Sequence, residues 1–83
     1  MESIDQKYSI EAVNNVTGVK HTSQDAVLFL AHDPIFLKRG LPAYIVGCRE
    51  KKCSKEFIKV LVGLKKRIEH YQKEHKDEVK LPD

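Results

Sequence analysis

The sequence predicts a mostly α-helical domain of three or four helices, in which the last helix is the longest and a short N-terminal β-hairpin is an alternative start of the chain. Apolar side chains recur at helical spacing along the last third of the chain, and residues typical of helix caps flank the apolar segments. The 83 residues, of which 41% are hydrophobic and 33% charged, suffice for one small core, so we expect a single domain over residues 1–83. Its two ends, residues 1–7 and 77–83, are expected to be flexible.

Residues 8–21 fit two alternatives. In the first, which we favour, Ser9 caps a short helix that ends at Gly18, because glycine readily adopts the left-handed backbone that follows a helix. In the second, apolar and polar side chains alternate along a strand that turns back at Asn14 to form a β-hairpin.

A second helix is expected over the apolar run 26–31. Thr22 and Asp25 form a Thr-x-x-Asp start signal for it, although Glu or Gln is usual at the second position. This helix should end near His32, because a residue close before a proline is pushed out of helical geometry.

Asp33 and Pro34 mark the start of another short helix, since Asp is a preferred cap and proline fits the first helical turn. Gly40 is expected to end it. The next segment, 41–48, is ambiguous: a proline near its start suits a helix, whereas its β-branched and aromatic residues also favour a strand.

Ser54 is the expected cap of the longest helix, from Lys55 to about His75. Its apolar residues are spaced four, three, four, three and four apart, which is a heptad seam. The seam consists of Phe57, Leu61, Leu64, Ile68, Tyr71 and His75. We expect a core that consists of Leu28, Phe29, Phe36, Leu37, Tyr44, Ile45, Phe57, Leu61, Leu64 and Ile68.

The seam has two interpretations. It packs on the protein's own helices, or its C-terminal part contacts a protein partner or a second copy in a weak homodimer. The residues predicted for such a partner-binding site are Leu64, Ile68, Tyr71 and His75.

Charge is distributed unevenly along the chain. Residues 1–37 contain two basic and five acidic side chains, whereas residues 38–83 contain 13 basic and seven acidic ones. Within the second part, four lysines recur every seven residues and are a candidate nucleic-acid-binding stripe, or else an ordinary solvated face. These are Lys52, Lys59, Lys66 and Lys73. Ala43, Gly47 and Cys53 also match part of a helix-turn-helix spacing.

Two cysteines and two histidines suggest a zinc site formed by Cys48, Cys53, His70 and His75. A helix from Ser54 through His70 excludes it, because a rise of about 1.5 Å per residue separates Cys53 from His70 by about 25 Å. Zinc holds its ligands at about 2.0–2.3 Å, so we predict no metal site.

A redox role for the two cysteines is the remaining chemical hypothesis. Cys53 precedes a helix start and lies among lysines, an electrostatic setting that stabilises a thiolate. Cys48 would act as its resolving partner if the intervening turn folds back. Buried structural thiols are the alternative interpretation.

No catalytic motif, apolar run of membrane-spanning length or secretory signal is found in the sequence, and two cysteines are too few for a disulfide scaffold. We therefore predict a small, non-enzymatic, cytoplasmic interaction or regulatory module that binds protein through a helix. We predict no cofactor, membrane contact or small-molecule substrate. The alternative is a nucleic-acid-binding protein that uses the lysine stripe or the partial helix-turn-helix.

Overall fold

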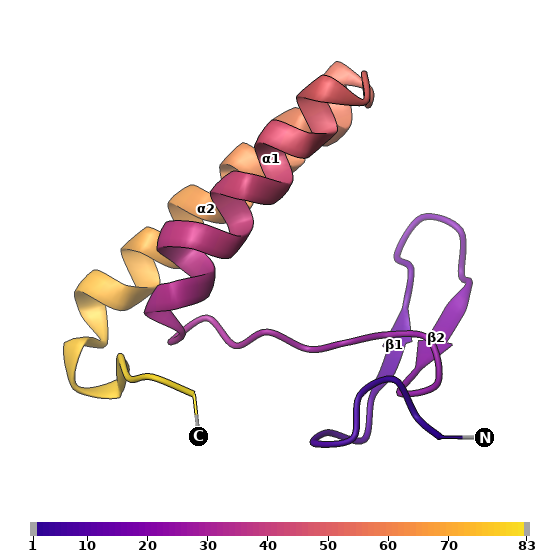
Figure 1. Cartoon of the computed structure of the whole chain (residues 1–83), viewed down its shortest axis with the longest axis horizontal. Coiled ribbons are helices and arrows are strands. Elements are labelled where there is room, and N and C mark those ends of the chain that lie inside the picture. The colour runs from indigo at the N-terminus through magenta and orange to yellow at the C-terminus, as the bar shows by residue number, and fades with distance from the viewer. Residues whose placement is uncertain (1, 83) are drawn as a thin grey trace.

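The protein divides into an N-terminal β-hairpin and a C-terminal pair of antiparallel helices, joined by an extended segment (Figure 1). The computed structural model describes residues 2–82, so Met1 and Asp83, the outermost residues of the two ends predicted to be flexible, lie outside the described residues. About half of the chain is helical. We call residues 2–30 the N-terminal arm and the two packed helices the helix pair.

The helix pair consists of α1 (Leu41–Glu50) and α2 (Lys55–Glu74), and the arm contains strands β1 (Glu11–Val13) and β2 (Lys20–Thr22). A short 3₁₀ helix, Lys76–Glu78, follows α2. Within residues 2–82 the prediction of three or four helices is therefore only partly confirmed, because a long C-terminal helix and a short hairpin are present but only two α-helices form.

The predicted cap and extent of α2 are confirmed. Ser54 Oγ accepts a hydrogen bond from the Phe57 N–H at 3.1 Å, which satisfies a backbone donor that the first helical turn leaves without a partner. The helix ends at Glu74, one residue before its predicted end.

The start of the preceding helix is also confirmed. Asp33 Oδ1 accepts the N–H groups of Ile35 at 2.8 Å and of Phe36 at 3.1 Å. Helical backbone then runs without interruption over residues 34–50, so the ambiguous segment 41–48 is helical.

The prediction that Gly40 ends this helix is wrong, because the chain passes through Gly40 at φ −65° and ψ −53°. Gly40 instead closes a π-helical segment, Phe36–Gly40, in which the Leu41 N–H donates to the Phe36 carbonyl. Pro42 explains the wider turn: it has no N–H to donate, and its ring would clash with the carbonyl four residues back. A Cβ at Gly40 would lie only 3.1 Å from Phe36 Cδ1, so the missing side chain admits the Phe36 ring.

The helix expected over 26–31 does not form, although its start signal does. Asp25 Oδ1 accepts the Thr22 N–H at 2.9 Å, and the Ala26 N–H reaches the Thr22 carbonyl at 2.9 Å, which completes one turn. The Leu28 N–H then donates to Asp5 Oδ2 at 3.0 Å instead of to a helical carbonyl. A helix this short gains too few hydrogen bonds to offset the cost of starting it, so the long-range bond prevails.

The β-hairpin is the correct alternative for residues 8–21, and the favoured helix is wrong. Strands β1 and β2 pair antiparallel with Ala12 opposite His21. The loop is longer than the predicted turn at Asn14, whose Oδ1 accepts the N–H groups of Val16 at 2.8 Å and Thr17 at 3.0 Å. Gly18 takes a positive φ of 75° within this loop rather than after a helix.

The core lies between the two helices. Its buried side chains are Leu37, Leu41, Ile45, Cys48, Leu61 and Ile68. Phe36, Ile58 and Leu64 pack against this cluster while partly exposed. Four residues predicted for the core are instead exposed, because the segment and helix flanks that carry them face solvent: Leu28, Phe29, Tyr44 and Phe57.

The turn between α1 and α2 is a Schellman motif. The Cys53 N–H donates to the Cys48 carbonyl at 2.9 Å, and the Lys52 N–H donates to the Arg49 carbonyl at 3.1 Å. This motif requires a left-handed backbone at the residue before Cys53, and Lys52 supplies it with a φ of 59°. Glycine usually occupies that position, which explains why the sequence gives no sign of the motif.

The strands of the arm do not pack on the helix pair, although Phe29, near the end of the arm, stacks on the Phe36 ring with centroids 4.5 Å apart. Within residues 2–82, neither strand packs against either helix (Figure 1). The chain exposes 6929 Å² of surface, whereas a compact monomer of 9.6 kDa exposes about 5,100 Å². The radius of gyration is 14.2 Å, against about 12 Å for a compact chain of this length.

The strained lysine in the turn gives the first prediction. Lys52→Gly should raise the free energy of unfolding by about 0.5–1 kcal/mol, because relief of the left-handed lysine exceeds the added entropy of an unfolded glycine. Thermal unfolding followed by circular dichroism should show a rise in Tm of a few degrees. Lys51→Gly is the matched control: it removes the same charge from a residue with φ −85° and should not stabilise the protein. Equal effects of the two substitutions would contradict this explanation.

Candidate functional site

The predicted thiol pair is brought together by the turn. Cys48 occupies the last turn of α1 and Cys53 the residue before the cap of α2, and the backbone bond that joins them places them at the two positions of a Schellman motif whose side chains meet. Both cysteines are free thiols. The structure thus satisfies the condition set by the sequence, that the intervening turn folds back.

The two thiols differ in environment. Cys48 is buried, with 5% of its surface exposed, whereas Cys53 is only partly buried. Burial is the main cause that raises the pKa of the Cys48 thiol, and the adjacent Cys53 side chain adds to the rise. The neighbouring Cys48 thiol in turn raises the pKa of the Tyr44 phenol. Tyr44, one helical turn before Cys48, therefore forms one cluster with the two cysteines.

The four residues predicted for partner binding do not share one environment. Ile68 is buried in the core of the helix pair. Leu64 and Tyr71 are half-buried, and the Tyr71 ring packs on the His75 ring with centroids 4.4 Å apart. His75 Nδ1 lies 2.7 Å from Glu78 Oε2, so its ring also joins α2 to the 3₁₀ helix. The seam is used mainly within the protein itself.

The lysine stripe is exposed along its whole length: Lys52, Lys59, Lys66 and Lys73. The neighbouring Lys65 differs, because its Nζ binds Glu69 Oε1 at 2.8 Å. The helix-turn-helix spacing is not realised, since Gly47 lies inside α1 and the chain turns only after Glu50.

An apolar surface of the helix pair went unrecognised in the sequence. Phe57, Val60 and Leu64 lie within about 60° of one another around α2. When an antiparallel pair is viewed from one end, successive residues run clockwise around one helix and anticlockwise around the other. The Phe57 flank of α2 and the Tyr44 flank of α1 are therefore on the same side of the pair. The sequence predicts Tyr44 and Phe57 in the core, and Val60 lies outside the heptad seam. We call these four residues the apolar face: Tyr44, Phe57, Val60 and Leu64.

Exposure distinguishes the apolar face from the core beneath it. Tyr44 is 56% exposed, Val60 59% and Phe57 40%. Leu64 is half-buried and connects the face to the core. Three large side chains are thus presented to solvent on one side of a rigid element.

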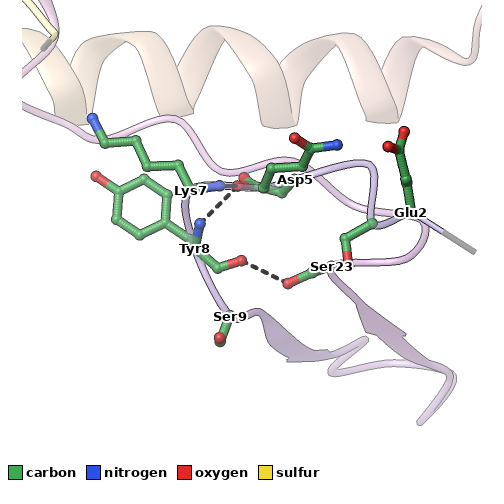
Figure 2. Close-up of a pocket in the computed structure, with 8 residues that line it drawn as sticks. Glu2, Asp5, Lys7, Tyr8, Ser9 and Ser23 are labelled. Carbon is green, nitrogen blue, oxygen red and sulfur yellow. Dashed lines mark hydrogen bonds between the residues drawn. The ribbon is translucent and has the colours of Figure 1, made fainter.

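An open cavity of about 500 Å³ lies in the N-terminal arm, lined by Asp5, Tyr8, Ser23 and neighbouring residues (Figure 2). Its polar groups are used to fold the arm. Ser23 Oγ donates to the Tyr8 carbonyl and accepts the Ile10 N–H, both at 2.7 Å. Asp5 Oδ1 accepts the Tyr8 N–H at 2.8 Å, the bond drawn in Figure 2. This hydroxyl and this carboxylate therefore serve the fold of the arm.

The described residues form no metal-binding group. Among residues 2–82, no three His, Cys, Asp or Glu side chains come together in a way that would hold an ion. None of the helices in this part of the chain combines the length and the apolar character needed to cross a membrane.

Comparison of the chain with models of protein families, with curated proteins and with solved structures finds no match. Function therefore has to be inferred from the chemistry of the surfaces described above.

The Asp5 carboxylate gives a prediction about pH. Its hydrogen bonds from the backbone N–H groups of Tyr8 and Leu28 lower its pKa below the ordinary value of 3.8. A lowered folded-state pKa means that this stabilisation of the arm is complete above the unfolded pKa and is lost as pH falls through the folded one. The amide resonances of Tyr8 and Leu28 should therefore shift with a midpoint below 3.8.

Asp5→Asn is the control for this titration. The amide side chain retains an acceptor but does not titrate in this range, so the pH dependence of both resonances should disappear. A midpoint at or above the ordinary pKa in the wild-type protein would contradict the proposed role of the carboxylate.

Proposed function

We propose that this protein is a small interaction module without catalytic activity, which binds a protein partner through the apolar face of the helix pair. The observation that supports the proposal is the presence of Tyr44, Phe57 and Val60 on one exposed surface. Exposed apolar patches on a folded domain are typical of interaction sites, and aromatic residues are enriched where binding energy is concentrated. A regulatory role and a cytoplasmic location stay predictions from the sequence.

The charge of the helix pair indicates the chemistry of the partner. Residues 38–83, which include both helices, contain 13 basic and seven acidic side chains. A complementary partner therefore presents an apolar centre with an acidic rim, because opposite charges at the rim guide the encounter. A second copy of the chain meets this description through its arm, since residues 1–37 contain five acidic and two basic side chains. This contact differs from the weak homodimer predicted from the sequence, which uses the C-terminal part of the seam.

The excess surface provides enough area for such a contact. The chain exposes 6929 Å², which is about 1,800 Å² more than a compact monomer of its mass. Stable protein interfaces bury about 1,200–2,000 Å² in total. Because such a total is divided between two partners, the packing of an apolar, acidic segment on the apolar face would remove about a third to a half of the excess.

A double substitution on the apolar face and a single control substitution away from it test the proposal. Val60 is 59% exposed on the face, and Val46 is 52% exposed two positions after Tyr44, hence about 160° away from it around α1. Tyr44→Ser/Val60→Ser should weaken binding at least tenfold, whereas Val46→Ser should change it less than twofold.

Binding is measured in two ways. Sedimentation equilibrium at high micromolar concentration reports self-association, and titration with a purified partner isolated from the native cell reports binding to another protein. Both variants should keep the wild-type Tm within a few degrees, because the substituted side chains are exposed. A wild-type chain that stays monomeric and retains no partner would refute the proposal, as would equal losses in the two variants.

Nucleic-acid binding is the second candidate function. The observation that favours it is the exposure of all four lysines of the stripe, three of which lie on α2. Replacement of Lys59, Lys66 and Lys73 by Ala should reduce the slope of log K against log salt by about 2–3 on duplex DNA, because each phosphate contact contributes about 0.9.

The slope is measured by fluorescence anisotropy with a labelled duplex at salt concentrations from about 50 to 200 mM. The control replaces Lys38, Lys65 and Lys76, which removes the same net charge from outside the stripe. Absence of binding at the lowest salt concentration would eliminate this candidate. So would an equal loss of slope in both triple variants, since binding would then depend on net charge alone.

A further inference from the structure

We propose that Cys48 and Cys53 form a reversible dithiol–disulfide site, which exchanges with low-molecular-weight disulfides through Cys53 and closes through Cys48. The inference is independent of the proposed protein binding. It rests on the geometry of the turn, in which the chain folds back between the two cysteines and joins their backbones by a 2.9 Å hydrogen bond.

The helix cap determines the approach of the two side chains. The two outer positions of a Schellman motif commonly make an apolar contact that closes the end of the helix. Here both positions are cysteines, and the Cys53 side chain lies against the Cys48 thiol. Closure of a disulfide therefore requires neither helix to unwind, because the left-handed Lys52 already reverses the chain.

The environments of the two cysteines assign their roles. Cys48 is buried, and burial raises the pKa of its thiol, so it remains protonated at neutral pH. Cys53 is partly exposed and is the thiol that an external reagent reaches first. Lys51, Lys52 and Lys55 are its exposed neighbours in the chain, and their charge favours an anionic disulfide such as that of glutathione.

The reaction has two exchange steps. The Cys53 thiolate attacks one sulfur of the external disulfide, whose sulfur–sulfur bond breaks and releases one thiolate. The Cys48 thiol then loses its proton to solvent and attacks Cys53 Sγ, which releases the second external thiolate. The two protein thiols thereby lose two electrons and two protons, and the external disulfide is reduced to two thiols.

The test uses the reduced wild-type chain with glutathione disulfide at neutral pH. The expected product is a monomer lighter by two hydrogens. Trypsin cleaves after Arg49, Lys51 and Lys52, so a Cys48–Cys53 bond should hold two tryptic peptides together until a reductant is added. The oxidised protein should melt on the order of 10 °C higher, because the bond closes a short loop in the unfolded chain.

Single variants separate the two steps. Cys48→Ala keeps an apolar side chain in the core and should accumulate a mixed disulfide with one glutathione at Cys53. Cys53→Ala should react more slowly than Cys48→Ala, because only the buried thiol remains.

Three results would overturn the proposal. The first is a wild-type protein that stops at the mixed disulfide, and the second is a product that consists of disulfide-linked dimers. The third is an internal disulfide whose formation leaves the Tm unchanged or lowers it, since the turn geometry would then not fit the bond.

Discussion

The contact between α1 and α2 is the interaction on which the rest of the structure depends. Leu41 and Ile45 on one helix face Leu61 and Ile68 on the other, and these side chains form most of the buried core. A helix of ten or twenty residues is only marginally stable alone in water, so each helix requires the apolar stripe of the other. The Schellman turn holds the two helices antiparallel, and it also determines where the two cysteines meet.

The arm is stabilised differently from the helix pair. Its strands contain three residues each, all exposed, and its order comes from polar groups such as Asp5 and Ser23 rather than from a core. The end of the arm is tied to the helices, where the Phe29 ring stacks on the Phe36 ring with centroids 4.5 Å apart. The segment that follows is held by Gln72 Nε2, which donates to the Ala31 carbonyl at 2.9 Å and to the Asp33 carbonyl at 3.1 Å. This division leaves one side of the helix pair uncovered. The apolar face and the excess surface area are consequences of the same arrangement.

The sequence predicted the features that depend on local chemistry. The caps at Asp33 and Ser54 and the extent of α2 follow from hydrogen bonds between near neighbours, and the heptad spacing correctly placed Leu61 and Ile68 toward another helix. Features that depend on distant partners were missed. The bond from the Leu28 N–H to Asp5 spans 23 residues and removed a predicted helix.

The candidate site shows the same limit. The thiol pair was identified from residue type, but its geometry depends on a left-handed Lys52 that no sequence pattern indicates. The apolar face was missed because the sequence predicts Tyr44 and Phe57 in the core, whereas both are exposed and the hairpin lies apart from α1 and α2 (Figure 1). Native-state hydrogen exchange measured by NMR tests the central claim, that the helix pair is the folding unit and the arm is ordered separately. Amides of α1 and α2 should share the highest protection, equal to the free energy of global unfolding, while amides of β1 and β2 exchange through smaller openings. Strand amides as protected as those of α2 would contradict this account.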